Sequence, residues 1–221
     1  MVTRSRIAQI IGLLRGSYGD PAWKRRLEPV GELVLTILSQ NTSDTNSHRA
    51  YQSLMQTFGN WEKIAAASDG AIAEAIRSGG LADIKAGYIK NALVALKSET
   101  RDFNLSFLKD MGIDEARKWL TRLPGVGMKT ASCVLLFSLG MPAFPVDTHV
   151  YRVAGRLGLI GDGISRDAAH FEMERLTPAE DTYRCHILLI EHGRSTCKAR
   201  RPLCRTCVLA KICPSYKLFV K

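Results

Sequence analysis

The sequence contains no apolar run that approaches the roughly 18–20 residues needed to span a bilayer. Residues 1–6 carry no secretory hydrophobic region, and no long basic or Ser-rich leader is found. These absences predict a cytoplasmic protein without a membrane partner, and they favour a bacterial or archaeal source. Alternating strand patterns, Asn-Gly hairpin turns, internal repeats and low-complexity linkers are missing as well.

Apolar residues recur at helical spacing through most of the chain instead. Thr3 is a candidate N-cap for the first helix, and Ser43 begins a later helix that ends at Gly59. The fold is therefore predicted to be all-α. The expected helices cover residues 7–14, 33–38, 44–58, 61–67, 69–76, 84–96, 114–120, 129–139, 148–157, 166–176 and 183–192.

Basic residues outnumber acidic ones, 31 to 21, so the net charge is +10 and the isoelectric point lies near 9.5. The excess gathers toward the two chain ends, because residues 193–213 contain Lys and Arg but no Asp or Glu. Such an excess is typical of proteins with a polyanionic partner, since each neutralised phosphate releases counterions. A basic protein without such a partner is the alternative.

Four of the six cysteines, Cys197, Cys204, Cys207 and Cys213, follow the spacing C-x6-C-x2-C-x5-C. Four thiolates this close together can hold a zinc ion or a [4Fe–4S] cluster. Structural zinc sites usually pair two short cysteine knuckles, whereas only one is present, so the spacing favours iron–sulfur over zinc. The other two, Cys133 and Cys185, lie in apolar helical stretches and are expected to be small buried residues.

The loop between the first two of these cysteines carries Lys198, Arg200 and Arg201. Metal ligands at both ends would restrain the loop and reduce the entropy that its basic side chains lose on meeting phosphate. We therefore expect these three residues to contact DNA. The alternative is a solvated charged face around a cluster that only stabilises the fold.

The segment 123–131, Leu-Pro-Gly-Val-Gly-Met-Lys-Thr-Ala, joins two apolar helices. Pro124 ends the first helix. Gly125 and Gly127 permit a positive φ and leave the backbone accessible to a ligand. The free N–H groups at the start of the next helix would then suit a DNA phosphate. A turn that merely connects two helices is the alternative.

Three motifs in order, segment 123–131, Val-Asp-Thr-His at 146–149 and the cysteine tail, resemble the endonuclease III branch of the helix-hairpin-helix (HhH-GPD) DNA glycosylases. The resemblance covers essentially the whole chain, including residues 39–44 and Gly80-Leu81 followed by Lys85-Ala86. It implies a six-helix barrel over residues 23–141 and an iron–sulfur cluster domain made of residues 1–22 and 142–221, with the active cleft between them. The cofactor it implies is a [4Fe–4S] cluster.

The resemblance also implies a monomeric, bifunctional DNA glycosylase and abasic-site β-lyase of base excision repair. Its partner would be duplex DNA with damaged bases, oxidised pyrimidines first, or abasic sites. Lys129 would form a Schiff base with the sugar, and Asp147 would stabilise positive charge at C1′. Lys129 as a phosphate contact and Asp147 as only a helix N-cap are the alternatives. His149 is interpreted as a polar residue that either stabilises the fold or supports a neighbouring site residue.

Further residues correspond to the family's DNA contacts. Leu81 matches an apolar wedge that enters the base stack, with an ordinary loop leucine as the alternative. Asn41 stands where the family commonly has Gln opposite the flipped base, and Ala82-Asp83 replaces an aromatic-bearing loop. These departures leave open a mismatch or modified-base glycosylase on the same scaffold. A catalytically silent iron–sulfur DNA-binding protein that kept the hairpin and the cluster is a separate alternative, and the presence of both Lys129 and Asp147 argues against it. The expected hairpin contacts are Gly125, Val126 and Gly127.

Overall fold

The computed structural model describes residues 4–220, and every regular element in that range is a helix. The all-α prediction is therefore confirmed, whereas the candidate cap Thr3 lies outside the described residues. The chain forms two compact units. One, the hairpin unit, is Arg25–Met141, and the other, the cysteine unit, combines Met1–Lys24 with Pro142–Lys221. Among the helices of residues 4–220, none has the length and apolar character that a membrane crossing requires.

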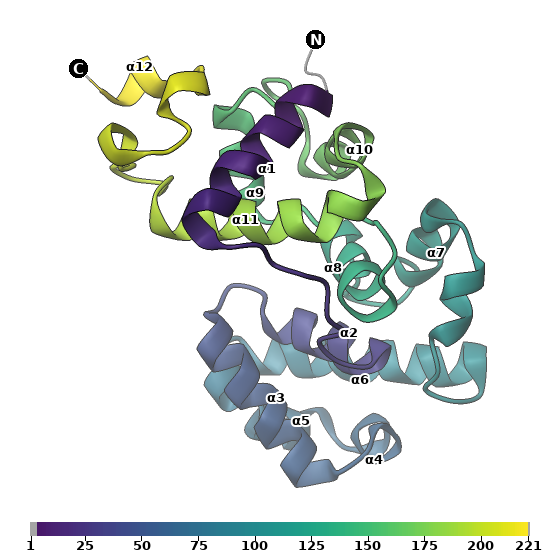
Figure 1. Cartoon of the computed structure of the whole chain (residues 1–221). Coiled ribbons are helices and arrows are strands. Elements are labelled where there is room, and N and C mark those ends of the chain that lie inside the picture. Colours follow the sequence, from purple (N-terminus) through teal and green to yellow (C-terminus); the bar gives the residue numbers. More distant parts are fainter. Residues whose placement is uncertain (1–3, 221) are drawn as a thin grey trace. The chain divides into compact units, whose positions relative to one another are not determined.

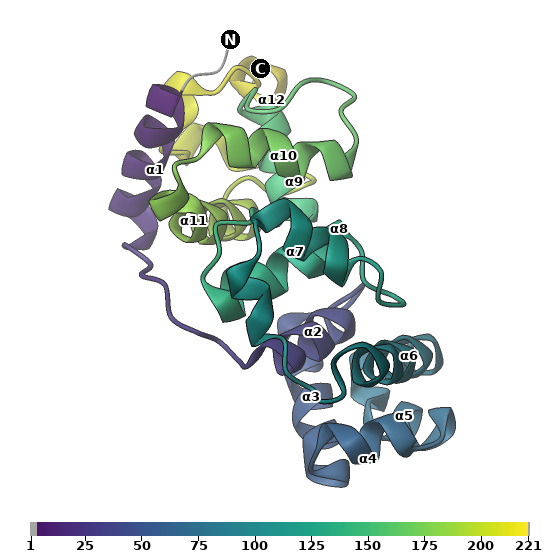
Figure 2. The same ribbon diagram turned by 90° about the vertical axis from the view of Figure 1, so that its right-hand side faces the viewer.

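The hairpin unit is built around a buried helix, α2 (Pro29–Leu38), all ten residues of which are buried. The Glu28 carboxylate caps its start by accepting from the backbone N–H groups of Val30 (2.9 Å) and Gly31 (2.5 Å). Pro29 fits the first helical position, where no N–H is needed. The unit also contains α3 (Asp44–Phe58), α4 (Trp61–Ala66), α5 (Asp69–Ala75), η1 (Arg77–Gly79), α6 (Ala82–Thr100), η2 (Ser106–Asp110), α7 (Ile113–Leu120) and α8 (Met128–Cys133). Of these, α3, α6 and α8 pack directly against α2, whereas α4 and α5 pack against α6, and α7 packs against α8 (Figure 2).

The helix expected over residues 129–139 is α-helical only in its first half. The α-helical part, α8, ends at Cys133, and the wider π-helical turn η3 (Val134–Ser138) follows. Hydrophobic periodicity carries no signal for such a turn, because all five of its residues are buried. The last carbonyls find donors outside the helix: Arg26 N–H donates to Phe137 O (3.2 Å), and Arg25 Nε donates to Ser138 O (3.1 Å).

The cysteine unit contains α1 (Arg4–Tyr18), α9 (Thr148–Arg156), α10 (Arg166–Leu176), η4 (Ala179–Asp181) and α11 (Thr182–Ser195). α1 packs against α11, and α11 packs against α9 (Figure 1). The predicted apolar face of α1, made of Ile7, Ile10, Ile11 and Leu14, is buried in this core. Cys185 lies in the same core and Cys133 is buried in the hairpin unit, as expected. Burial raises the pKa of the Cys185 thiol to about 12.

The chain after α11 has little regular structure. It contains only the short turns η5 (Cys204–Thr206) and η6 (Ala210–Ile212) and the four-residue helix α12 (Tyr216–Phe219). Leu209 is the one residue of this tail that is fully buried within residues 196–220. The other apolar contacts of the tail with the core are partial, through Cys197, Cys207, Ile212 and Cys213.

Candidate functional site

The hairpin between α7 and α8 is fixed by two buried side chains and one glycine. Leu123 and Val126 are 2 % and 6 % exposed, and Val126 N–H donates to Leu123 O (3.1 Å). Gly125 has φ +75° and lies directly on Tyr88 of α6, where an added Cβ would come within 2.8 Å of Tyr88 Cβ. The turn therefore needs glycine at position 125, both for its backbone and for its packing.

Gly127 serves a different purpose from the one expected. Its φ is −93°, so it does not need the positive φ that the sequence suggested for both glycines. It stands at the N-cap of α8 without a side-chain cap, and nothing lies within 4 Å of the place where its Cβ would be. The backbone at the start of α8 is thus open to a ligand. Val126 faces the interior, so any contact it makes with a ligand comes from its backbone.

Lys129 lies in the first turn of α8 and is partly exposed. Within the hairpin unit its amine has no hydrogen-bond or ion-pair partner. The amine of Lys129 is therefore available to a ligand that approaches the hairpin.

Asp147 is the N-cap of α9, as the sequence indicated. Its Oδ1 accepts a 2.7 Å hydrogen bond from Val150 N–H, and it is partly exposed. Oδ2 has no hydrogen-bond partner within the described residues of the cysteine unit. One oxygen thus fixes the orientation of the carboxylate, and the other is free for chemistry.

The segment that leads to Asp147 is held by α10, which the sequence reasoning missed. Glu174 Oε1 accepts from Phe144 N–H (2.8 Å), and Nδ1 of the buried His170 lies 2.8 Å from Phe144 O and 3.2 Å from Val146 N. His170 and Glu174 are four residues apart, and so share one face of α10. That spacing was the available signal, although a single sequence does not reveal which backbone the pair meets.

His149 has the structural role expected of it. Its Nδ1 lies 3.2 Å from Arg152 Nη2, and its Cβ would be 3.0 Å from a Cβ added to Gly193 of α11. The close approach of α9 and α11 at this point depends on Gly193.

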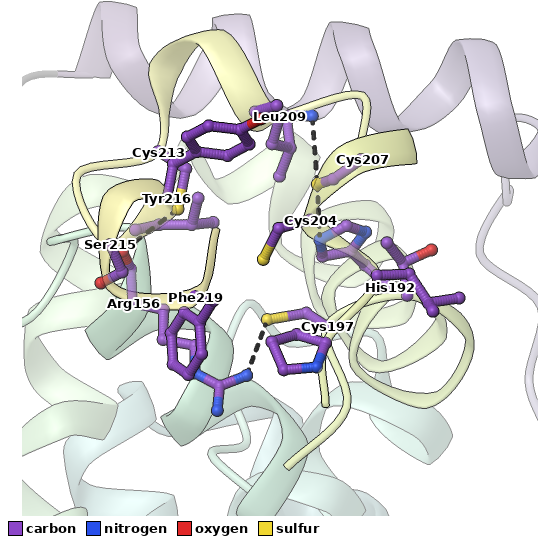
Figure 3. Close-up of a pocket in the computed structure, with 15 residues that line it drawn as sticks. Arg156, His192, Cys197, Cys204, Cys207, Leu209, Cys213, Ser215, Tyr216 and Phe219 are labelled. Atoms are coloured by element: carbon purple, nitrogen blue, oxygen red, sulfur yellow. Dashed lines mark hydrogen bonds between the residues drawn. The ribbon is translucent and has the colours of Figure 1, made fainter. Parts of the chain in front are cut away.

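The four tail cysteines line one pocket, and all are free thiols (Figure 3). Their sulfurs come from both sides of the pocket, with Cys197 just after α11 and the others from η5, the segment that follows it and the segment before α12. Within residues 4–220, no three His, Cys, Asp or Glu side chains are arranged to hold a single metal ion. Four free thiols in one pocket are a donor set of the kind that holds a zinc ion or an iron–sulfur cluster.

Hydrogen-bond donors surround the sulfurs. Arg156 Nη1 donates to Cys197 Sγ (3.4 Å), and Leu209 N–H donates to Cys207 Sγ (3.4 Å). His192 Nε2 lies 3.7 Å from Cys207 Sγ, and its Nδ1 lies 3.1 Å from Tyr18 O–H. Burial lowers the pKa of His192 to about 4, so this imidazole is neutral at neutral pH. Donors of this kind stabilise thiolate ligands.

Two arginines of α9 hold the start of the tail. Arg152 donates from Nη2 to Gly193 O (2.8 Å) and from Nε to Cys197 O (3.0 Å). Arg156 donates from Nη1 to Lys198 O (2.7 Å) and from Nη2 to Ala199 O (3.0 Å). The sequence reasoning missed both residues, although their four-residue spacing places them on one helix face. The helix that begins at Asp147 therefore also fixes the cysteine tail.

The basic loop between Cys197 and Cys204 is closed by its own backbone, because Leu203 N–H donates to Thr196 O (3.0 Å). Lys198, Arg200 and Arg201 are all exposed on it. Arg201 has φ +52°, a conformation that is uncommon for a residue with a side chain. The loop thus displays its three cations from a restrained backbone.

Asn41 and Leu81 share an unexpected backbone conformation. Their φ angles are +53° and +51°, so both are left-handed, and both are exposed, Leu81 by 52 %. Each lies shortly after the end of a helical segment, Asn41 after α2 and Leu81 after η1.

Known proteins resemble this chain in sequence and in fold. Residues 34–179 match the family model described as HhH-GPD superfamily base excision DNA repair protein. An endonuclease III of Sulfolobus acidocaldarius is 38 % identical, with 83 % of this chain and 81 % of that protein aligned. A solved structure of a trapped endonuclease III–DNA covalent intermediate, in an estranged-adenine complex, is 27 % identical with a TM-score of 0.84, and both chains are fully covered (100 %).

A longer relative is also found. A protein of Arabidopsis thaliana that is named as a DNA glycosylase is 41 % identical over 75 % of this chain. The aligned part makes up 57 % of the plant protein, so the chain spans little more than half of that relative.

The two hairpin glycines provide a matched pair for a stability test. Gly125→Ala should lower the free energy of unfolding by about 1–3 kcal/mol, because the new Cβ meets Tyr88 and φ is positive. Gly127→Ala should lower it by less, by about 1 kcal/mol at most, because its φ is ordinary, its surroundings are open and only the poorer capping by Ala counts. Urea denaturation followed by circular dichroism measures both. Equal effects of the two substitutions would contradict the hairpin geometry.

Proposed function

Because the chain belongs to the HhH-GPD superfamily of base excision DNA repair proteins and to its endonuclease III family, we propose that it is a bifunctional DNA glycosylase and abasic-site lyase. The observation that carries the proposal is the free amine of Lys129 at the exit of the hairpin, in a chain similar to an endonuclease III that was trapped covalently on DNA. The substrate is duplex DNA with a damaged base, oxidised pyrimidines first, or an abasic site. We also propose that the protein acts as a monomer in the cytoplasm, associated with the nucleoid, because its substrate is the DNA held there.

The reaction begins with a target nucleotide that leaves the duplex, since a stacked base is inaccessible. The backbone at Gly127 and the start of α8 binds a phosphate beside it. The Lys129 amine attacks C1′ with its lone pair while the bond from C1′ to the base breaks, and the base departs with the bonding electrons and takes up the proton that the amine loses. The positive charge that develops on the sugar is stabilised by the free oxygen of Asp147.

The lyase step follows from the same covalent bond. The sugar ring opens to give a Schiff base between Lys129 and C1′, which acidifies the proton on C2′. Loss of that proton expels the 3′ phosphate by β-elimination, and water then releases the amine. Lys129 therefore serves both steps, whereas Asp147 acts mainly in base removal.

The four tail cysteines are proposed to hold a [4Fe–4S] cluster, which stabilises the fold of the tail when bound and has no redox step assigned to it. The support is one pocket lined by four free thiols, with N–H donors directed at Cys197 and Cys207. Four thiolates around the cluster leave a net charge of about −2, which Arg156 at the pocket partly offsets.

The catalytic pair is tested with Lys129→Ala and Asp147→Asn. Lys129→Ala should lose borohydride trapping and strand cleavage at abasic sites but still bind DNA, because the hairpin backbone is unchanged. Asp147→Asn should reduce base removal by about two to three orders of magnitude, typical of one lost electrostatic group. Its fold should persist, because Asn Oδ1 can still accept from Val150 N–H. Near-normal excision by Asp147→Asn would contradict the catalytic role of Asp147 and show that it only caps α9.

The cluster is tested by iron content. The purified protein should be yellow-brown with about four irons per chain. Cys204→Ser and Cys207→Ser should lose iron and solubility, because ligand binding is coupled to folding. Cys185→Ala, which removes a cysteine from the core instead, should keep its iron. Stoichiometric zinc and no iron, in protein made anaerobically with ample iron, would refute the assignment.

The basic loop is tested by salt dependence. Arg200→Ala and Arg201→Ala should each weaken DNA binding and reduce the slope of log affinity against log salt by about one per lost phosphate contact. Arg175→Ala on α10 removes the same charge from an exposed pair with Glu172 and should leave the slope unchanged. Identical slopes for all three variants would show that the loop is only a solvated face.

A further inference from the structure

Lys85, in the first turn of α6, is a buried lysine without an acidic partner. The residue is 1 % exposed, and no Asp or Glu within the described hairpin unit forms an ion pair with it. Burial lowers the pKa of its ammonium group. Lysine is almost never fully buried unless it is paired, because an unpaired charge loses its hydration. The position therefore requires a specific explanation.

The ammonium group joins the ends of two helical segments. Lys85 Nζ donates to Leu38 O (2.7 Å) and to Gly79 O (2.8 Å). Leu38 is the last residue of α2, and Gly79 is the last residue of η1. Carbonyls at helix C-termini lack intrahelical donors and carry partial negative charge, so a cation suits both ends.

The two segments also touch directly. An added Cβ at Gly79 would lie 3.1 Å from Ala50 Cβ of α3 and 3.9 Å from Leu38 Cδ2 of α2. A larger residue at position 79 would therefore separate η1 from α2 and α3. The short distance that Lys85 spans depends on this close packing.

The two exposed left-handed residues follow these two carbonyls. Asn41 is three residues beyond Leu38, and Leu81 is two residues beyond Gly79. A left-handed residue with a side chain is strained, and it persists only where its surroundings determine it. Lys85 fixes the backbone shortly before both of them.

We propose that Lys85 is a positioning residue for two loops: the Asn41 loop, residues 39–43 between α2 and α3, and the Leu81 loop, residues 80–81 between η1 and α6. It holds the two loops in a fixed arrangement, so that Asn41 and Leu81 can enter the space that a flipped nucleotide leaves. The inference rests on the proposed function, because that function supplies the DNA-inserting roles of Asn41 and Leu81. A pair of loops ordered in advance loses less conformational entropy when it meets DNA. Lys85 itself lies in the interior and touches neither base nor sugar.

Lys85→Met tests this role, because methionine keeps the length of the side chain but donates to neither carbonyl. The control is Lys97→Met, which removes the same charge from an exposed position on the same helix. Both are compared with the wild-type holoprotein on a duplex in which 2-aminopurine lies beside a tetrahydrofuran abasic analogue. Its fluorescence rises when the neighbouring stack is opened, and no bond needs to be cleaved.

Wild type and Lys97→Met should give the same rise in fluorescence, and Lys85→Met should lose most of it. Excision from duplex DNA by Lys85→Met should fall by about 100-fold, the effect expected from a small misplacement of positioning groups. Borohydride trapping on a single-stranded abasic site should remain near the wild-type level, because that substrate requires no opening of a stack. A general loss of fold would reduce trapping and iron content together.

A double-mutant cycle identifies the route of the effect. If Lys85 acts through the wedge, Lys85→Met should cost much less in a Leu81→Ala background than alone. Lys85→Gln, which keeps one amide donor and buries no charge, should give an intermediate fluorescence and covers the case in which Lys85→Met fails to fold. Wild-type fluorescence in Lys85→Gln or Lys85→Met, or fully additive effects with Leu81→Ala, would overturn the proposal. Absence of trapping by the wild type would refute the proposed chemistry and still leave the fluorescence test valid.

Discussion

The structure of the cysteine unit depends on the hydrogen bonds that Arg152 and Arg156 of α9 donate to the backbone of the tail. Leu209 anchors the tail in the core, and these hydrogen bonds fix the backbone on both sides of Cys197. The same helix begins at Asp147. Disorder in the tail would therefore remove contacts from α9, the helix that Asp147 caps. The cysteine tail is thus linked through α9 to the carboxylate of the proposed chemistry.

The hairpin unit contains a similar arrangement, in which the buried Lys85 donates hydrogen bonds to two backbone carbonyls. Lys85 there does for the ends of α2 and η1 what the arginines of α9 do for the tail. In both places, a long basic side chain from a neighbouring helix donates to backbone carbonyls that lie within a few residues of expected DNA contacts. The positive charge of this protein thus has internal uses in addition to the exposed ones on the basic loop.

The proposed chemistry divides between the two units. The hairpin unit supplies the Lys129 amine and the backbone at Gly127, and the cysteine unit supplies Asp147 and the basic loop. Lys129 and Asp147 are both partly exposed, so burial does not distinguish them from other charged residues. What distinguishes them is an unsatisfied atom beside a fixed backbone, an amine in one unit and a carboxylate oxygen in the other.

The sequence by itself determined the all-α class, most helix positions, the caps at Ser43 and Asp147, the burial of Cys133 and Cys185 and the family. These follow from local patterns, since periodicity, caps and motif spacing are read within a few residues along the chain. Only the tertiary structure decided that, of the two hairpin glycines, Gly125 has a positive φ and Gly127 does not. It further decided that α8 continues as a π-helical turn from Val134, and that Asn41 and Leu81 have left-handed backbones. It also decided the partners of Lys85, Arg152, Arg156 and His170, because each of these side chains meets a backbone distant in sequence, and a local pattern holds no information on which backbone that is.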